Sequence, residues 1–136
     1  MSAHNTASAM PPAPGRAFKI TSWALRLLAA AVFLAAGGAK IAGLPMMVGI
    51  FDSIGLGQWL RVFTGLVEVA GAIIILLPAT AAWGGLLLAV TMFFAVLIHL
   101  FVIGGSAVPA GVLLLVTAMV AWLHRASLSA ALGRRG

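Results

Sequence analysis

The sequence predicts an all-α bundle of four transmembrane helices, with both termini in the cytoplasm. Of the 136 residues, 63% are hydrophobic and only 7% are charged, whereas a soluble domain has about 25% charged residues. Four apolar stretches long enough to cross a bilayer follow one another, separated by segments containing glycine or proline. We therefore expect a multi-pass protein of the cell (inner or plasma) membrane, surrounded by the lipid bilayer and without a nucleic-acid partner.

Three regions are predicted along the chain. Residues 1–15 are small, polar and rich in proline, which is typical of a disordered tail. Residues 16–125 form the four-helix membrane domain, and residues 126–136 form a basic C-terminal tail. Residues 44–59 connect the first two spans, and Pro45 favours a short helix there. The spans themselves are expected at about 22–43, 60–77, 82–103 and 107–124.

The first span has an alternative interpretation. A basic segment, the apolar run Leu27–Ala36 and the small residues that follow it also describe a cleavable signal peptide. The segment before the run is unusually long for a signal peptide, and the helical pattern continues to Gly43. We therefore expect an uncleaved span, and a mature chain that starts at Lys40 is the alternative.

The orientation follows from the basic side chains, which give the chain its net charge of +6. Six of the eight lie near the two ends of the chain, and two, Lys40 and Arg61, lie on the opposite side of the predicted bundle. Because cytoplasmic flanks of membrane helices carry the excess of lysine and arginine, both termini are expected in the cytoplasm.

Glu68 lies near the middle of the second span, where an isolated carboxylate costs at least a few kcal/mol. Counted from the outer ends of their spans, Lys40 lies about 5 Å deep, His99 about 6 Å and Glu68 about 12–13 Å. Side chains lean towards the amino end of their own helix, so Lys40 and His99 lean inward and Glu68 leans outward. We therefore predict a Lys40–Glu68 pair, with His99 lining the same cavity and Arg61 at its entrance.

A purely structural role for this charge cluster is the alternative. A buried lysine–glutamate pair can neutralise two costly charges and fix the register of two helices without binding anything. A histidine within a helix bundle is more often a hydrogen-bonded contact residue than a ligand. The cluster is therefore a candidate site, and its ligand is a hypothesis.

Small residues mark the expected helix contacts. Gly65 and Gly71 lie three residues on either side of Glu68 and share its helix face. Gly37 lies near the outer end of the first span, and we expect all three glycines to allow close approach of neighbouring helices. In the first span, small residues that recur every four positions also predict a packing face, formed by Ala31, Ala35, Ala39 and Gly43.

No covalently bound or metal cofactor is expected. The chain has no cysteine, which excludes disulfides and thiolate metal sites. Glu68 and His99 together supply too few ligands for a metal site. His124 is expected at the opposite face of the membrane from His99, so one chain does not offer a haem two histidines at one depth.

The motifs resemble those of the DoxX-like family of small four-helix membrane proteins. The resemblance extends over about residues 25–123 and rests on Gly37-x-x-Lys40, Gly55-Leu56-Gly57, Gly65-x-x-Glu68-x-x-Gly71 and Leu76-Leu77-Pro78. The family takes its name from a subunit of a quinone-linked sulfur oxidoreductase, and other members are linked to redox or assembly roles. The resemblance implies a four-helix fold in which Lys40, Glu68 and the surrounding glycines form the shared pattern.

Three functions fit these observations. In the first, a quinone or another lipophilic small molecule binds in the outer half of the bundle, where Lys40, His99 and Glu68 offer hydrogen bonds and a proton route. In the second, the chain is a non-enzymatic accessory or assembly subunit of a membrane complex, and a partner chain holds the redox centre. A homo-oligomer is the other partner that we consider. The third is a proton-coupled exporter. Exporters of this size carry the glutamate in their first span, whereas this chain carries it in the second, which ranks the exporter last.

Reporter fusions test the predicted orientation. Fusions at Gly15 and Gly136 should both report a cytoplasmic location, because both positions lie beside the basic flanks. A carboxyl terminus outside the cytoplasm, or a mature chain that starts at Lys40, would contradict the prediction.

Overall fold

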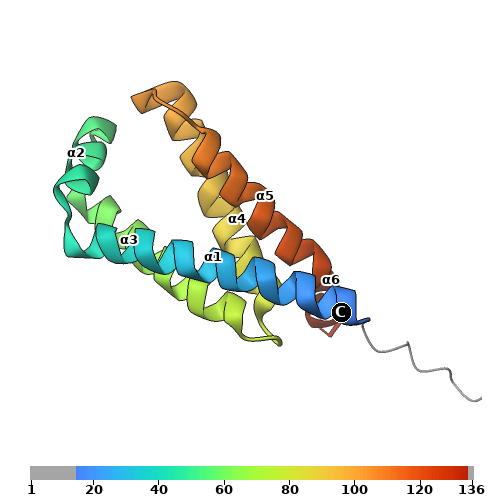
Figure 1. Cartoon of the computed structure of the whole chain (residues 1–136). Coiled ribbons are helices and arrows are strands. Elements are labelled where there is room, and N and C mark those ends of the chain that lie inside the picture. The colour runs from blue at the N-terminus through green and yellow to red at the C-terminus, as the bar shows by residue number, and fades with distance from the viewer. Residues whose placement is uncertain (1–14, 135–136) are drawn as a thin grey trace, which may run out of the picture.

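The computed structural model describes residues 15–134, and the chain within this range is a series of helices (Figure 1). In chain order these are α1 (Arg16–Ala42), α2 (Pro45–Ile54), α3 (Gln58–Leu76), α4 (Ala81–Ile98), the π-helical segment η1 (His99–Ile103), α5 (Val108–Leu123) and α6 (Arg125–Gly133). Three helices, α1, α3 and α4 continued by η1, are long and apolar enough to cross a membrane. The 16-residue α5 meets this criterion only together with α6, from which it is bent by 57°. The predicted all-α membrane bundle is confirmed, with three to four candidate spans.

The ends of the chain differ from the predicted outline. Helix α1 begins at Arg16 rather than near residue 22, because no glycine or proline interrupts the chain between Gly15 and Gly37. It ends at Ala42, because the left-handed backbone of Gly43 (φ 71°) stops the helix. The segment predicted as a basic C-terminal tail contains α6, in which serine, alanine and leucine continue the helix after the bend. The predicted disordered tail lies outside the described residues, apart from Gly15.

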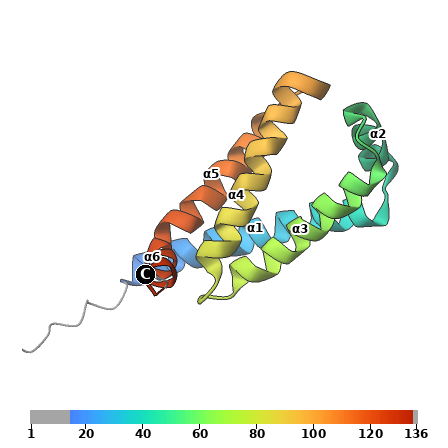
Figure 2. The same cartoon turned by 180° about the vertical axis from the view of Figure 1, so that it is seen from behind.

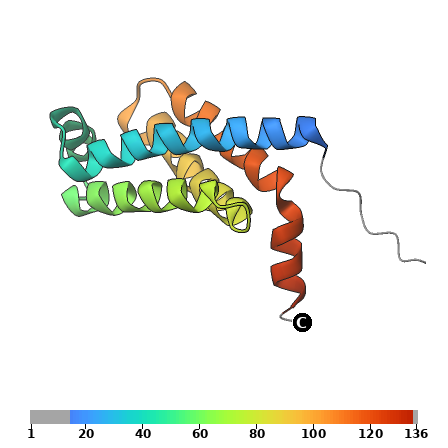
Figure 3. The ribbon, with the colours of Figure 1, turned by 60° about the horizontal axis from the view of Figure 1, so that its bottom comes forward.

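The helices form two antiparallel pairs that meet at one end and diverge at the other (Figures 1 and 2). Helix α1 packs along α3, α4 packs along α5, and α3 joins the two pairs by its contact with α4. Both ends of the described chain lie at the closed end of this V, as an even number of spans requires (Figure 1). Helix α2 and η1 lie at the open end, where they approach each other. Figure 3 shows α6 turning away from α5 at the closed end.

Glycines set the distance between the packed helices. A Cβ atom at Gly37 would lie 2.8 Å from the carbonyl oxygen of Gly65, and one at Gly65 would lie 2.9 Å from the carbonyl oxygen of Gly37. The backbones of α1 and α3 therefore touch at this point. A Cβ atom at Gly71 would lie 2.6 Å from Cδ2 of Leu88 in α4, so this glycine lies where α3 meets α4. All three glycines singled out in the sequence lie at helix contacts.

The packing face of α1 differs from the predicted one. Phe33 is fully buried, and Ala29, Ala30 and Gly37 are buried on the same side of the helix. By contrast, Ala31 and Ala35 of the predicted small-residue stripe are exposed within the monomer. The prediction that this small-residue stripe forms the packing face of α1 was therefore wrong. The large side chain of Phe33 packs between the helices, and the small residues that share its face determine how closely they approach.

Neighbouring glycines of α1 provide a matched test of the α1–α3 contact. We expect Gly37→Ala to lower the free energy of unfolding by about 1–3 kcal/mol, the usual cost of overpacking, because the added methyl group meets backbone. Gly38→Ala is the control, since a Cβ atom there would meet nothing within 4 Å, and alanine favours the helix by up to about 1 kcal/mol over glycine. Unfolding of both variants in detergent micelles measures the difference. Equal stability of the two would contradict the contact.

Candidate functional site

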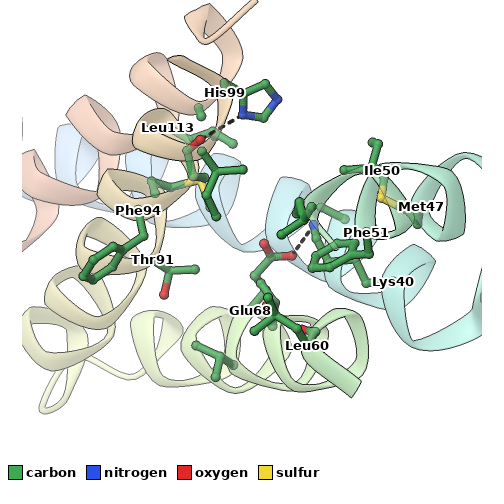
Figure 4. A pocket seen from close by; sticks show the side chains of 18 of the residues that line it. Lys40, Met47, Ile50, Phe51, Leu60, Glu68, Thr91, Phe94, His99 and Leu113 are labelled. Carbon is green, nitrogen blue, oxygen red and sulfur yellow. Dashed lines mark hydrogen bonds and ion pairs between the residues drawn. The ribbon is translucent and has the colours of Figure 1, made fainter. Parts of the chain in front are cut away.

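A cavity of about 530 Å³ lies between the two helix pairs, in the half of the bundle that contains α2 and η1 (Figure 4). Each of the helices α1 to α5 and η1 contributes to its wall, and the lining is almost wholly apolar. Its size falls within the range of about 300–1,000 Å³ typical of small-molecule sites. Its aromatic and polar lining residues include Phe33, Lys40, Phe51, Phe63, Thr64, Glu68, Thr91, Phe94 and His99.

Lys40 and Glu68 form an ion pair at the wall of this cavity. The Nζ atom of Lys40 donates a hydrogen bond to Oε2 of Glu68 at 3.0 Å. The Glu68 side chain is 2% exposed and that of Lys40 is 14% exposed. Lys40 lies in the last turn of α1, where the negative end of the helix dipole also favours a cation. The contact expected from the opposed directions of these two side chains is present.

The ion pair has unused hydrogen-bonding capacity. Oε1 of Glu68 has no hydrogen-bond partner among residues 15–134, yet no fully buried polar side-chain atom in this range is left unpaired. Oε1 is therefore not fully enclosed by the protein, and Figure 4 shows the Glu68 carboxylate among the side chains that line the cavity. The ammonium group of Lys40 carries three N–H donors, of which Glu68 takes one. A ligand in the cavity can thus receive a hydrogen bond from Lys40 or give one to Glu68.

His99 lines the same cavity but is joined to neither member of the pair by a hydrogen bond among the described residues. Its Nδ1 lies 2.9 Å from the carbonyl oxygen of Ala95. A carbonyl oxygen only accepts, so Nδ1 carries a proton, and Nε2 of the neutral ring is left as an acceptor. His99 also opens the π-helical segment η1, and π-helical turns occur frequently at functional sites.

Arg61 lies outside the cavity lining, which differs from its predicted place at the entrance. Its Nη1 donates to the backbone carbonyl oxygen of Lys40, and its Nε donates to Oε1 of Gln58 at 2.6 Å. The last carbonyl groups of a helix have no partner within the helix, and they attract a cation. Arg61 therefore caps the C-terminal end of α1. Its effect on the site is indirect, because it holds the backbone of Lys40 in place.

The contribution of α2 to the cavity was not predicted from the sequence, in which residues 44–59 were expected to form a connection. Met47, Ile50 and Phe51 of this helix all line the cavity, and Phe51 is only 6% exposed. Their spacing of three and four residues, with Asp52 and Ser53 exposed, is the pattern of an amphipathic helix. This pattern could have predicted α2 as a wall of the site.

No group of three His, Cys, Asp or Glu side chains within residues 15–134 is arranged to hold a metal ion. The polar side chains that line the cavity include one cation, one carboxylate and one histidine, which suit an uncharged ligand with oxygen atoms.

The comparisons with known proteins point to one family. The model of the DoxX-like family matches residues 24–133, which include every helix from α2 to α6 and most of α1. No curated protein and no solved structure matches the chain.

A double-mutant cycle tests the ion pair. We expect Lys40→Met to lower the free energy of unfolding by about 3 kcal/mol, because it leaves the carboxylate of Glu68 buried without a partner. The double variant Lys40→Met/Glu68→Leu should recover most of this loss, since apolar residues of similar volume replace both charges. Equilibrium unfolding in micelles gives both values. A double variant no more stable than Lys40→Met would contradict a mutually compensating pair.

Proposed function

The chain belongs to the DoxX-like family of membrane proteins, and we propose that it binds a lipophilic small molecule with a carbonyl headgroup, such as a quinone, in the cavity beside Lys40 and Glu68. One observation carries the proposal. An ion pair with unused donors and acceptors faces an apolar cavity of about 530 Å³. A purely structural pair needs only contact between its two charges, so it would not require this space.

The chemistry of the lining supports a quinone-like headgroup. The Lys40 ammonium group is a donor suited to a carbonyl oxygen, and Oε1 of Glu68 is an acceptor suited to the hydroxyl of a reduced form. Nε2 of His99 is a second acceptor on the opposite helix pair. In a redox-linked role, a membrane redox partner would supply the electrons, and these three side chains would donate and accept protons at the headgroup oxygens.

The apolar part of the cavity supports a lipophilic tail or ring system. Phe33 and Phe51 lie on one side of the cavity and Phe94 on the other, and aromatic side chains stack favourably on flat rings. The cavity is only partly enclosed, and it lies between helices that cross the membrane. A lipophilic molecule could therefore enter from the bilayer without crossing water.

Ligand-dependent stabilisation tests the proposal. Decylubiquinone, a short-chain quinone, should raise the unfolding temperature of the wild-type protein, because a ligand at about 100 times its Kd adds about 2.7 kcal/mol of stability. The variant Lys40→Met/Glu68→Leu should fold and lose this stabilisation. Asp52→Asn is the control, since it alters the only other acidic side chain, which is exposed and outside the cavity. Undiminished stabilisation of the double variant would place the function elsewhere.

A further inference from the structure

A second polar group lies at the closed end of the V, far from the cavity. Arg26 is ten residues into α1, about 15 Å from the start of the helix, and it is only 2% exposed. A flanking charge at the membrane surface would be solvated. Arg26 is instead enclosed between α1 and the C-terminal end of α3, so its charge needs compensation from nearby groups.

The protein itself compensates this charge only in part. Nε of Arg26 donates to the carbonyl oxygen of Ile75 at 2.7 Å, and Nη2 donates to that of Leu76. The ring of Trp23 lies 4.1 Å from the centre of the guanidinium group and covers one of its faces. The C-terminal end of a helix is equivalent to about half a negative charge. These contacts therefore leave a positive site.

Neither acidic side chain of the protein supplies the missing negative charge. The chain contains two, Asp52 and Glu68. Glu68 pairs with Lys40, and Asp52 is exposed at the other end of the molecule, where it accepts a hydrogen bond from Gln58. A buried charge without a counter-ion is strongly destabilising, which favours an anion from outside the chain.

A hollow of about 360 Å³ lies beside Arg26, and basic and polar side chains form part of its lining. Lys19, one of its lining residues, adds a second positive charge. Ser22 and His124 are joined across it by a contact of 2.7 Å between Oγ and Nε2. The Nη1 atom of Arg26 makes no hydrogen bond within residues 15–134, and since no completely buried polar side-chain atom in this range is unpaired, Nη1 is not fully enclosed by the protein. The complete lining is Phe18, Lys19, Ser22, Trp23, Arg26, Pro78 and His124.

We propose that this hollow binds one phosphate group through Arg26, Lys19 and His124. Guanidinium groups match the geometry of phosphate oxygens, and basic pockets between membrane helices on the cytoplasmic side suit lipid headgroups. The hollow lies at the end of the bundle that holds both termini, the end expected in the cytoplasm. The phosphate can come from an anionic phospholipid of that leaflet or from a free phosphate, and the two sources share this chemistry.

Binding of defined lipids and of inorganic phosphate tests the proposal. The wild-type protein in detergent is titrated with phosphatidylglycerol, phosphatidylcholine and inorganic phosphate, and its unfolding temperature is followed. Arg26 also holds the end of α3, so the informative variant is Lys19→Gln/His124→Gln, which leaves Arg26 in place. It should bind phosphatidylglycerol or phosphate at least about fivefold more weakly, as expected for the loss of one lysine contact to an anionic headgroup. Arg134→Gln is the control for net charge, because Arg134 is exposed and does not line the hollow.

Selective stabilisation by phosphatidylglycerol that the double variant loses supports a lipid site. Stabilisation by inorganic phosphate alone that the same variant loses supports a site for a free anion. Equal effects of the two lipids without a response to phosphate would overturn the proposal. A response that Lys19→Gln/His124→Gln retains, or that Arg134→Gln loses equally, would also overturn it.

Discussion

The ion pair between Lys40 and Glu68 determines the structure of the half of the bundle that contains α2 and η1. An isolated carboxylate near the middle of a membrane helix costs at least a few kcal/mol, and Glu68 offsets this cost by pairing with Lys40. It can do so because Gly37 and Gly65 bring the backbones of α1 and α3 into contact one turn away from the pair. Arg61 then holds the carbonyl group of Lys40 at the end of α1. The placement of the two charges therefore depends on the packing of the small residues between α1 and α3.

The same packing explains why a cavity forms beside the pair. At the closed end, a four-residue link between α3 and α4 forces these helices into contact. There a Cβ atom at Gly84 would lie 2.6 Å from the backbone nitrogen of Ile75. At the other end, the 10-residue α2 is inserted between α1 and α3 and faces η1. The pairs thus diverge from a tight contact, and the space between them is lined by apolar side chains and by one ion pair.

Much of this arrangement could be predicted from the sequence. The depth and side-chain direction of Lys40 and Glu68 follow from helix geometry, and the glycines around Glu68 follow from their spacing. The packing face of α1 could not be predicted in this way, because alanines and glycines occur on several of its faces and only Phe33 in its structural context distinguishes them. The burial of Arg26 could not be predicted from the sequence either. A basic residue near the start of an apolar run has the same sequence pattern whether it faces water or the end of a neighbouring helix.

Photo-crosslinking tests whether a lipophilic carbonyl compound binds beside Lys40 and Glu68. The protein in membranes is labelled with an azido-substituted short-chain benzoquinone and digested, and the modified residues are identified by mass spectrometry. We expect adducts on cavity-lining residues of both helix pairs, such as Phe51 and Phe94, and competition by unlabelled decylubiquinone. Adducts confined to exposed residues such as Leu66, or labelling that the competitor leaves unchanged, would contradict the claim.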